Sequence, residues 1–541
     1  MTYSKKECAE IIIHQFGDDC RSTLIECDGQ TLLVDCHSEA LREEIESRSL
    51  PLPNLILHTH VAPEHCCEGQ SFGNIDIRVH ENLRELASDR GAYEQKIKTT
   101  WDDPDDWPNS MGRETYSVGG CAVCFPPEKE LLITNTFQGG DIIPWGSCEL
   151  EVIDLPIHGW HACGFILKHK GENIALFIGD LFHDGAQIIS YYDLTVCYGG
   201  TTLDQLSDTL ASIQKIDVEL YVPATGPLMD NGPKQARELQ EKLEKFNQAL
   251  SWKSSDFSPA ISPDYETVGT WKKFSEGLYQ NISWGNTIVC IDESGRALVI
   301  DPGPCDYELG EEKRKENFQE SFDVLERDCG LKSVDYLLIT HIHGDHYDLV
   351  PLMQERYAAK LAAWEPLADL IEDPESYPYS CLIPWYNIGT SALTVDERLN
   401  RAEPWYWNEI AIETVHLPGH CNIAAGYIFE FRGRKLAITG DQLQGNGEAM
   451  GFAGVPTNDF EPFYEGPVLS FQNLVGRGID LNIGGHGSSF PDCEKVYQES
   501  LALNQRALEA LAPILRGDDY QSIFRSKEIK EARTRFSDFE N

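Results

Sequence analysis

The sequence predicts two tandem α/β domains, and three observations lead to this prediction. The chain has 541 residues, of which 41% are hydrophobic and 24% charged, so it holds ample apolar material for more than one buried core. Apolar, strand-like runs alternate with helical stretches in both halves, an order typical of α/β layering. The same short motifs also recur in the same order in the two halves.

The repeated motifs begin with a hairpin whose second strand ends in an aspartate, Asp35 in the first half and Asp301 in the second. In each half an apolar strand then runs into histidines. Three later matches keep a nearly constant spacing, which is hard to reach by chance, and the sequence therefore indicates a tandem duplication. The later matches pair Asp154–His158 with His416–His420, Phe177–Asp180 with Ile438–Asp441, and Val222–Gly226 with Ile483–Gly487.

We expect the first domain at residues 1–252, a linker at 253–275 and the second domain at 276–541. A helix predicted at Lys234–Leu250 closes the first copy, because its leucine and phenylalanine side chains recur on one face. The stretch that follows is rich in Ser and Pro, a composition typical of a linker. From the duplication alone, we expect the halves to pack as an internal pseudo-dimer.

The charge balance bears on partners and location. The chain has 44 Lys+Arg against 88 Asp+Glu, a formal net charge of −44. Such a surface repels nucleic-acid phosphates and anionic lipids, so we expect neither nucleic acid nor membrane as a partner. The start of the chain lacks a signal-peptide core, and no apolar run reaches the length of about 18 residues that a membrane helix needs. We therefore expect a cytoplasmic protein with free thiols.

The second half contains the run His341-Ile-His343-Gly-Asp345-His346 directly after a predicted strand. Side chains two apart on an extended segment point the same way, and the glycine lets the chain turn so that the last two residues approach from another side. Imidazoles and a carboxylate this close together favour zinc or a similar first-row divalent cation. Further candidate ligands follow at expected loop ends: His420, Asp441 and His486.

This motif set resembles the metallo-β-lactamase-fold hydrolase superfamily, through the HxHxDH run, the LPGH ending at His420, the TGD ending at Asp441 and the GGHG around His486. The resemblance implies that each half is an αββα sandwich with metal ions at one edge of its two sheets. It also implies a ligand set for the second half. The first metal would be held by His341, His343 and His420, the second by Asp345, His346 and His486, and Asp441 would bridge them.

The resemblance further implies a metal-dependent hydrolase, in which a metal-bridging hydroxide attacks an ester, thioester or lactone-like bond of a small molecule. Asp345 would be the catalytic residue that orients the nucleophile. Two zinc ions would serve as cofactors, with manganese or iron as alternatives. Two other functions stay open, a mononuclear iron sulfur dioxygenase on the same fold and a non-catalytic metal-binding or scaffold protein. Cys421 departs from the family, which usually has a hydroxyl residue there.

The first half matches the pattern only in part. By the resemblance, the residues that match the first-metal ligands and the bridge are His58, His60, His158 and Asp180. The run that begins at His58 carries two residues more than its counterpart in the second half. Glu64 stands where the family has an Asp, and Thr225 stands where it has the last His. We expect a degenerate copy that braces the active one, ahead of a working one-metal site. The possible ligands of such a site are His58, His60, His65, His158 and Asp180, with Glu64 as a further candidate.

An aromatic-rich insertion lies between His346 and His420. Trp385 and Tyr386 belong to a loop that contains Pro and Gly, and we expect them to form a wall of the substrate site. We expect Trp364 and Trp407 to pack in the core instead.

Overall fold

The structure is a computed structural model, in which the chain divides into two compact units. Unit 1 comprises Met1–Gln248 with Glu509–Arg533, and unit 2 comprises Ala249–Leu508 with Thr534–Asn541. The boundaries expected from the sequence stay a prediction. The structure describes residues 2–18, 20–62, 65–66, 69–92, 129–155, 161–188, 196–197, 200–250, 265–282, 286–303, 311–373, 392–444, 448–449, 465–486 and 489–515.

Unit 1 contains two sheets. Neighbouring strands of the first sheet are antiparallel from β1 to β4 and parallel from β4 to β7. The second sheet has the order β14-β11-β10-β9-β8, with β14 parallel to β11. The strands of the first sheet are β1 Tyr3–Cys8, β2 Ile11–Phe16, β3 Ser22–Cys27, β4 Gln30–Val34, β5 Leu55–Leu57, β6 Asp76–His80 and β7 Asn135–Phe137, and those of the second are β8 Ile142–Trp145, β9 Cys148–Asp154, β10 Cys163–His169, β11 Glu172–Gly179 and β14 Tyr221–Pro223.

Apolar side chains from both sheets of unit 1 form one buried cluster between them, and a second cluster lies beneath helix α1. Helix α6 confirms the predicted amphipathic helix, because Leu239, Leu243 and Phe246 recur on one face and are buried. The helices are α1 Leu41–Ser47, α2 Arg84–Ser88, α5 Thr202–Ile213 and α6 Gly232–Leu250, with 3-10 turns η1 Gly69–Phe72 and η2 Glu81–Leu83 and a small ribbon of β12 Val196–Cys197 and β13 Gly200–Thr201.

Unit 2 repeats this order of antiparallel hairpins followed by parallel strands. Its first sheet runs β15 to β22, parallel from β19 onward, and its second has the order β23-β24-β25-β26-β29-β30, with β29 parallel to β26. The first sheet comprises β15 Glu266–Val268, β16 Trp271–Ser275, β17 Leu278–Asn281, β18 Ile288–Ile291, β19 Arg296–Ile300, β20 Ser333–Leu338, β21 Lys360–Trp364 and β22 Glu397–Leu399, and the second β23 Trp405–Trp407, β24 Ile410–His416, β25 Ala425–Phe431, β26 Arg434–Ile438, β29 Leu481–Ile483 and β30 Ser489–Phe490.

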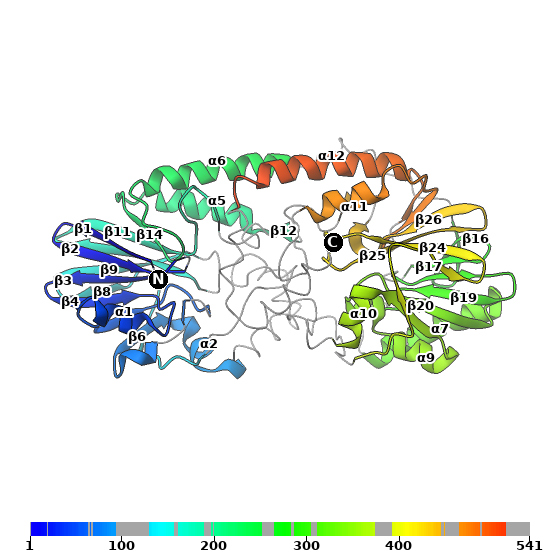
Figure 1. Cartoon of the computed structure of the whole chain (residues 1–541), viewed down its shortest axis with the longest axis horizontal. Helices are drawn as coiled ribbons and strands as arrows, with labels where there is room; N and C mark the ends of the chain where they lie inside the picture. Colours follow the sequence, from blue (N-terminus) through cyan, green and yellow to red (C-terminus); the bar gives the residue numbers. More distant parts are fainter. Residues whose placement is uncertain are drawn as a thin grey trace. The chain divides into compact units, whose positions relative to one another are not determined.

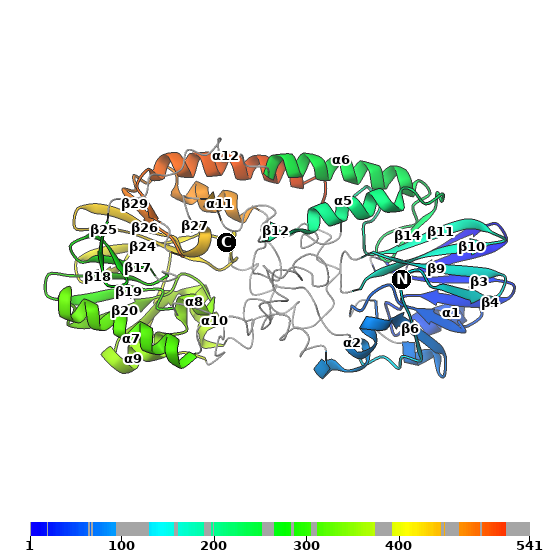
Figure 2. The ribbon, with the colours of Figure 1, turned by 180° about the vertical axis from the view of Figure 1, so that it is seen from behind.

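In each unit the two sheets lie between helices, with α1 and α2 on one side and α5 and α6 on the other in unit 1 (Figures 1 and 2). The predicted mixed α/β fold class is therefore confirmed. Trp364 and Trp407 are buried, as expected. The helices of unit 2 are α7 Glu311–Asp328, α8 Gly344–Tyr347, α9 Val350–Tyr357, α10 Glu365–Glu372, α11 Gly466–Leu474 and α12 Cys493–Leu511, with a 3-10 turn η7 Gly440–Gln442 and a small ribbon of β27 Leu443–Gln444 and β28 Glu448–Ala449.

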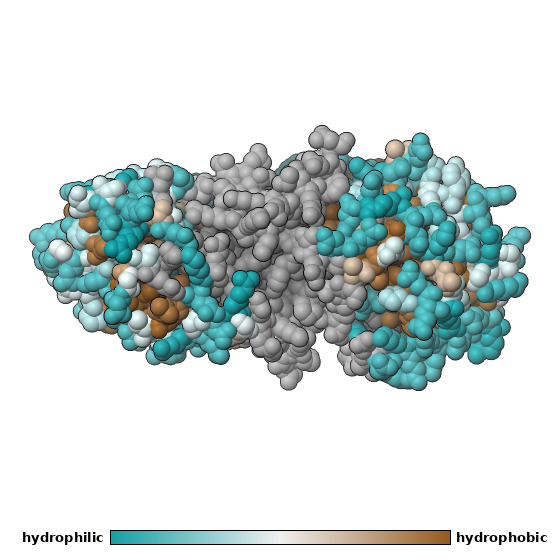
Figure 3. All heavy atoms as spheres, turned by 60° about the horizontal axis from the view of Figure 1, so that its bottom comes forward, coloured by the Kyte–Doolittle hydropathy of each residue, from teal (hydrophilic) through white to brown (hydrophobic). Residues whose placement is uncertain are grey.

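The face of the two units seen in Figure 3 is mostly hydrophilic, with small apolar patches between polar side chains. This agrees with the strongly acidic composition of the chain. Among the described residues, no helix is both long enough and apolar enough to cross a membrane.

Candidate metal centre

Parallel strands place the predicted ligands of unit 2 at one edge of its sheets. Strand β20 runs parallel to β19, and β26 runs parallel to β29, so the carboxyl ends of each pair lie together. The histidine-rich run follows β20, and the other ligands follow β24, β26 and β29. This arrangement brings together His341, His343, Asp345, His346, His420, Asp441 and His486 in two adjoining groups.

The first group consists of imidazoles and one thiol. His343 Nδ1 lies 3.0 Å from His341 Nε2 and 3.0 Å from His420 Nε2. Cys421 Sγ lies 3.5 Å from His343 Nε2, so the residue that departs from the family pattern joins the group as a further potential donor. All four side chains are buried, and their ligand atoms lie within 4.8 Å of one another.

The second group combines carboxylates with imidazoles. Asp441 Oδ2 lies 2.9 Å from His486 Nε2, and Asp441 Oδ1 lies 3.2 Å from His346 Nε2. Asp345 Oδ2 lies 3.5 Å from His346 Nε2 and 3.4 Å from His486 Nε2. Asp441 Oδ2 also lies 3.5 Å from His420 Nε2, so this carboxylate stands between the two groups, where a bridge is expected from the sequence.

Asp301, at the end of β19, fixes the orientation of both groups. Its carboxylate accepts hydrogen bonds from the backbone N–H and the hydroxyl of Thr340, both at 2.7 Å. His346 Nδ1 lies 2.9 Å from Asp301 Oδ2, and Thr340 Oγ1 lies 3.0 Å from His341 Nδ1. From the sequence, Asp301 was recognised as a repeated strand end but not as part of the site, although its recurrence as Asp35 was the signal for such a role.

Asn286 is a second supporting residue that the sequence did not reveal. Its side-chain amide donates to Asp345 Oδ2 at 2.8 Å and to the Asp345 carbonyl at 3.0 Å. Its own carbonyl oxygen accepts from the backbone N–H of His486 at 2.6 Å. Asn286 therefore ties together two ligands that lie far apart in the sequence. A lone asparagine before a strand carries no signal for this role.

Two glycines permit the close approach of backbone to the site. A Cβ atom on Gly303 would overlap the carbonyl of Asp345, and one on Gly485 would overlap Asp441 Oδ1. A larger residue would displace the Asp345 backbone at the first position and the Asp441 carboxylate at the second.

Burial and charge give the two groups different protonation. Burial lowers the pKa of His341 well below its usual value and that of His420 to about 3, so these imidazoles are neutral. Burial opposes charge on His346 and His486 as well, but the neighbouring carboxylates, Asp345 and Asp441 among them, raise the pKa of both. A cation entering the second group therefore has to displace protons.

The residues fit a divalent first-row cation. Asp345 Oδ1 is buried without a hydrogen-bond partner. Burying such an oxygen costs free energy, and a bound cation would remove that cost. Neutral imidazole nitrogens, carboxylate oxygens and one thiol form a donor set that zinc, manganese and iron accept. The assignment of each ligand to one of two ions stays a prediction.

The structure corrects the register predicted for the first half. Asp35 accepts hydrogen bonds from the backbone N–H and the hydroxyl of Thr59, both at 2.8 Å, as Asp301 does from Thr340. His60, which follows Thr59, therefore corresponds to His341, and no insertion is needed. Continuing along the chain, Ala62 takes the place of His343, Glu64 that of Asp345 and His65 that of His346.

This register leaves a smaller group in unit 1, made of His60, His65 and Asp180. His65 Nε2 lies 2.8 Å and His60 Nε2 3.7 Å from Asp180 Oδ2, while the Thr225 hydroxyl donates to Asp180 Oδ1 at 2.8 Å. His58 does not belong to the group, since its Nδ1 lies 3.7 Å from Asp35 Oδ1 and 3.6 Å from Cys66 Sγ. Metal binding here stays a prediction. The predicted residues His158, Glu64, Trp385 and Tyr386 lie outside the described residues.

Residues 284–486 match the sequence profile of the metallo-beta-lactamase superfamily. This segment is a metallo-β-lactamase superfamily domain. The match covers the edge at which all the predicted ligands of unit 2 meet, and it confirms the resemblance seen in the sequence motifs. The comparison with curated proteins gives no match.

The chain is also similar to solved metallo-β-lactamases. The subclass B3 enzyme BJP-1 of Bradyrhizobium japonicum is 15% identical, with 47% of this chain and 96% of that chain covered and a TM-score of 0.34. A HARLDQ-motif mutant of the Cronobacter sakazakii enzyme is 14% identical (48% and 93% covered, TM-score 0.31). MIM-1 of Novosphingobium pentaromativorans is 14% identical (53% and 93% covered, TM-score 0.31).

Proposed function

We propose that unit 2 is a dinuclear metal-dependent hydrolase that cleaves an ester, thioester or lactone-like bond of a small molecule. The observation that carries the proposal is the pair of adjoining donor groups on either side of Asp441, within a metallo-β-lactamase superfamily domain. Two bound divalent cations would supply a hydroxide nucleophile near neutral pH and stabilise the oxyanion formed by its attack.

The chain's own residues would hold and orient the reactants. We assign His341, His343 and His420 to one ion, Asp345, His346 and His486 to the other, and Asp441 to both. Asn286 donates to Asp345 Oδ2 and so fixes the carboxylate in the position from which it would hold the ion and orient the nucleophile. The side chain of His486 is 27% exposed while the other ligands are buried, so substrate would approach from its side.

We also propose that the two units arose by duplication and that unit 1 is a degenerate copy. The shared strand order and the recurrence of the Asp–Thr–His arrangement, Asp35-Thr59-His60 and Asp301-Thr340-His341, support this origin. The small-molecule substrate and the cytoplasmic location expected from the sequence belong to the same proposal.

The test is hydrolysis of an ester, thioester and lactone panel by the full chain, freed of metal and reloaded with zinc, manganese or iron. Asp345→Asn should lower turnover by at least about 10²-fold, the scale of positioned acid–base catalysis. Glu64→Gln, the matched change in the first half, should leave turnover unchanged. Equal turnover by the wild type and Asp345→Asn would contradict the proposal, as would oxygen consumption with one iron per chain.

A further inference from the structure

Unit 1 carries a second cluster of potential metal donors, separate from the histidine group that follows β5. Cys27, Cys148 and His169 are all buried, and one ligand atom from each lies within 4.8 Å of the other two. They lie at the opposite end of the strands from His60 and Asp180, because Cys27 precedes β4 whereas Asp35 follows it. No step of the proposed hydrolase uses them.

Tight hairpin turns hold these three side chains in place. Cys27 is the last residue of β3, before the turn Asp28–Gly29, and His169 is the last residue of β10, before Lys170–Gly171. Cys148 is the first residue of β9, after Gly146 and Ser147. The turn residues Asp28, Gly29, Gly146, Lys170 and Gly171 all have positive φ, as short primed turns require. Because such turns fix strand register, the donors are positioned before any ligand binds.

We propose that Cys27, Cys148 and His169 form a structural site for a thiophilic divalent cation, zinc above all. His169 and Cys148 are direct cross-strand partners, so their side chains share one face of the sheet. Zinc–sulfur and zinc–nitrogen bonds of about 2.3 Å and about 2.0–2.1 Å at a tetrahedral angle place S and N about 3.6 Å apart. Cys148 Sγ and His169 Nδ1 are 3.6 Å apart.

A thiol–imidazole hydrogen bond can have the same length, so the assignment depends on the surroundings of His169. Its Nδ1 also lies 3.4 Å from the Ser147 hydroxyl, which in turn lies 3.4 Å from Cys27 Sγ. Its Nε2 is buried without a hydrogen-bond partner, and Glu10 Oε2 lies 3.6 Å away. In a metal-binding histidine, one ring nitrogen usually faces the metal and its other ligands, and the second ring nitrogen faces a carboxylate. His169 has this arrangement.

The thiols have to lose their protons on binding. Burial, together with the adjacent Cys27 thiol, raises the pKa of Cys148 to about 12, so this thiol is protonated in the free protein. Binding of the cation replaces two S–H bonds by metal–thiolate bonds and releases two protons to solvent. Affinity should therefore fall as the pH is lowered.

Unit 2 lacks this cluster at the matching hairpins. The turn between β23 and β24 is followed by Ile410, and β25 ends on Phe431, and neither side chain can bind a metal ion.

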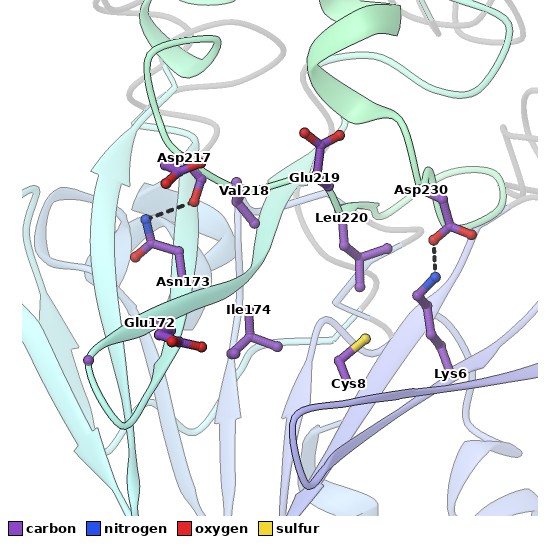
Figure 4. A pocket seen from close by; sticks show the side chains of 11 residues that line it. Lys6, Cys8, Glu172, Asn173, Ile174, Asp217, Val218, Glu219, Leu220 and Asp230 are labelled. Carbon is purple, nitrogen blue, oxygen red and sulfur yellow. Dashed lines mark hydrogen bonds and ion pairs between the residues drawn. The ribbon is translucent and has the colours of Figure 1, made fainter.

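Beside the site in unit 1, Gly171 and Cys8 help to line a cavity of about 680 Å³, whose lining also includes Lys6, Glu172 and Asp230 (Figure 4). The cavity contains none of the three proposed ligands.

The test is cobalt(II) titration of the full chain in a Cys421→Ser background, which removes the thiol near the metal centre of unit 2. Thiolate ligands give a near-ultraviolet charge-transfer band that imidazole and carboxylate ligands do not. The band should appear in Cys421→Ser, disappear when Cys148→Ser is added, and persist when Cys290→Ser, a buried cysteine outside the site, is added instead. Circular dichroism checks that each variant is folded.

Zinc X-ray absorption of the Cys421→Ser protein needs no change at the site itself. We expect sulfur neighbours at about 2.3 Å. A zinc-loaded protein with only nitrogen and oxygen neighbours would overturn the proposal, as would a cobalt band that survives Cys148→Ser. A disulfide between Cys27 and Cys148, found by mass spectrometry of the unreduced chain, would overturn it too. Hydrolase activity enters none of these readouts, so this inference stands or fails independently of the proposed function.

Discussion

Replacing Asp301 by asparagine tests whether the buried aspartate after β19 orients the metal centre. The carboxylate accepts two hydrogen bonds from Thr340 and lies 2.9 Å from His346 Nδ1. The amide side chain of Asp301→Asn would keep one acceptor oxygen and place an N–H₂ group against Thr340 or His346. His346 would then lose a charge-assisted hydrogen bond and the tautomer that it enforces.

The expected loss follows from these contacts. A hydrogen bond to a charged group contributes about 1.5–3 kcal/mol, and since each 1.4 kcal/mol is tenfold, this corresponds to about 10–100-fold in metal affinity. Loss of a residue that orients a ligand typically has the same effect. Asp301→Asn should therefore bind zinc at the centre about 10–100-fold more weakly.

The assay is competition for zinc between the full chain and a chromophoric chelator. Asp35→Asn is the matched control, because Asp35 makes the same two hydrogen bonds to Thr59 in unit 1. It should leave the affinity of the unit 2 centre unchanged. An affinity of folded Asp301→Asn within about threefold of wild type, a difference well below that of one charged hydrogen bond, would refute the orienting role of Asp301.

Three further outcomes are expected. Gly485→Ala should displace the Asp441 carboxylate and lower metal affinity by at least about tenfold. The same chelator assay measures this loss. An unchanged affinity would contradict the close approach of the Gly485 backbone to Asp441. Metal affinity should also fall as the pH is lowered, because the carboxylates raise the pKa of His346 and His486 and protons then compete with the cation; a pH-independent affinity would contradict this. Burial lowers the pKa of His416 from 6.5 to about 4, so the unfolded chain takes up this proton first and stability falls as the pH drops through 6.5. The free energy of unfolding should fall by about 2 kcal/mol between about pH 7 and about pH 5 through this residue. Denaturation curves of His416→Gln should lack that loss. Equal pH dependence of the wild type and His416→Gln would contradict the prediction.

The sequence was sufficient to single out the candidate ligands that meet at one edge of unit 2, because the run from His341 to His346 is local and the later candidates follow apolar strands. Asn286 could not be found in this way, since only folding brings it between Asp345 and His486. The spacing of the histidines alone predicts the wrong register for the first half. The geometric feature that recurs in both units is the hydrogen bond from threonine to aspartate, Thr59 to Asp35 in unit 1, which no spacing of histidines reveals.

The cysteine cluster of unit 1 was invisible for a related reason. Cys27, Cys148 and His169 come from three separate hairpins, and no short motif contains two of them. Only the pairing of β9 with β10, and the packing of both against β3 in one core, brings the three together. Strand pairing over such sequence distances follows from the whole fold and not from local pattern.

The central claim is that unit 2 holds two metal ions on either side of Asp441. The most direct measurement is the metal content per chain of the wild type and of Asp441→Ala, by elemental analysis after saturation with zinc and removal of excess, with circular dichroism to confirm folding. Because Asp441 would contribute to both ions, its loss weakens both sites, and the variant should hold at least one ion fewer than the wild type, whatever other sites the chain contains. Equal metal content in the two folded proteins would contradict the claim.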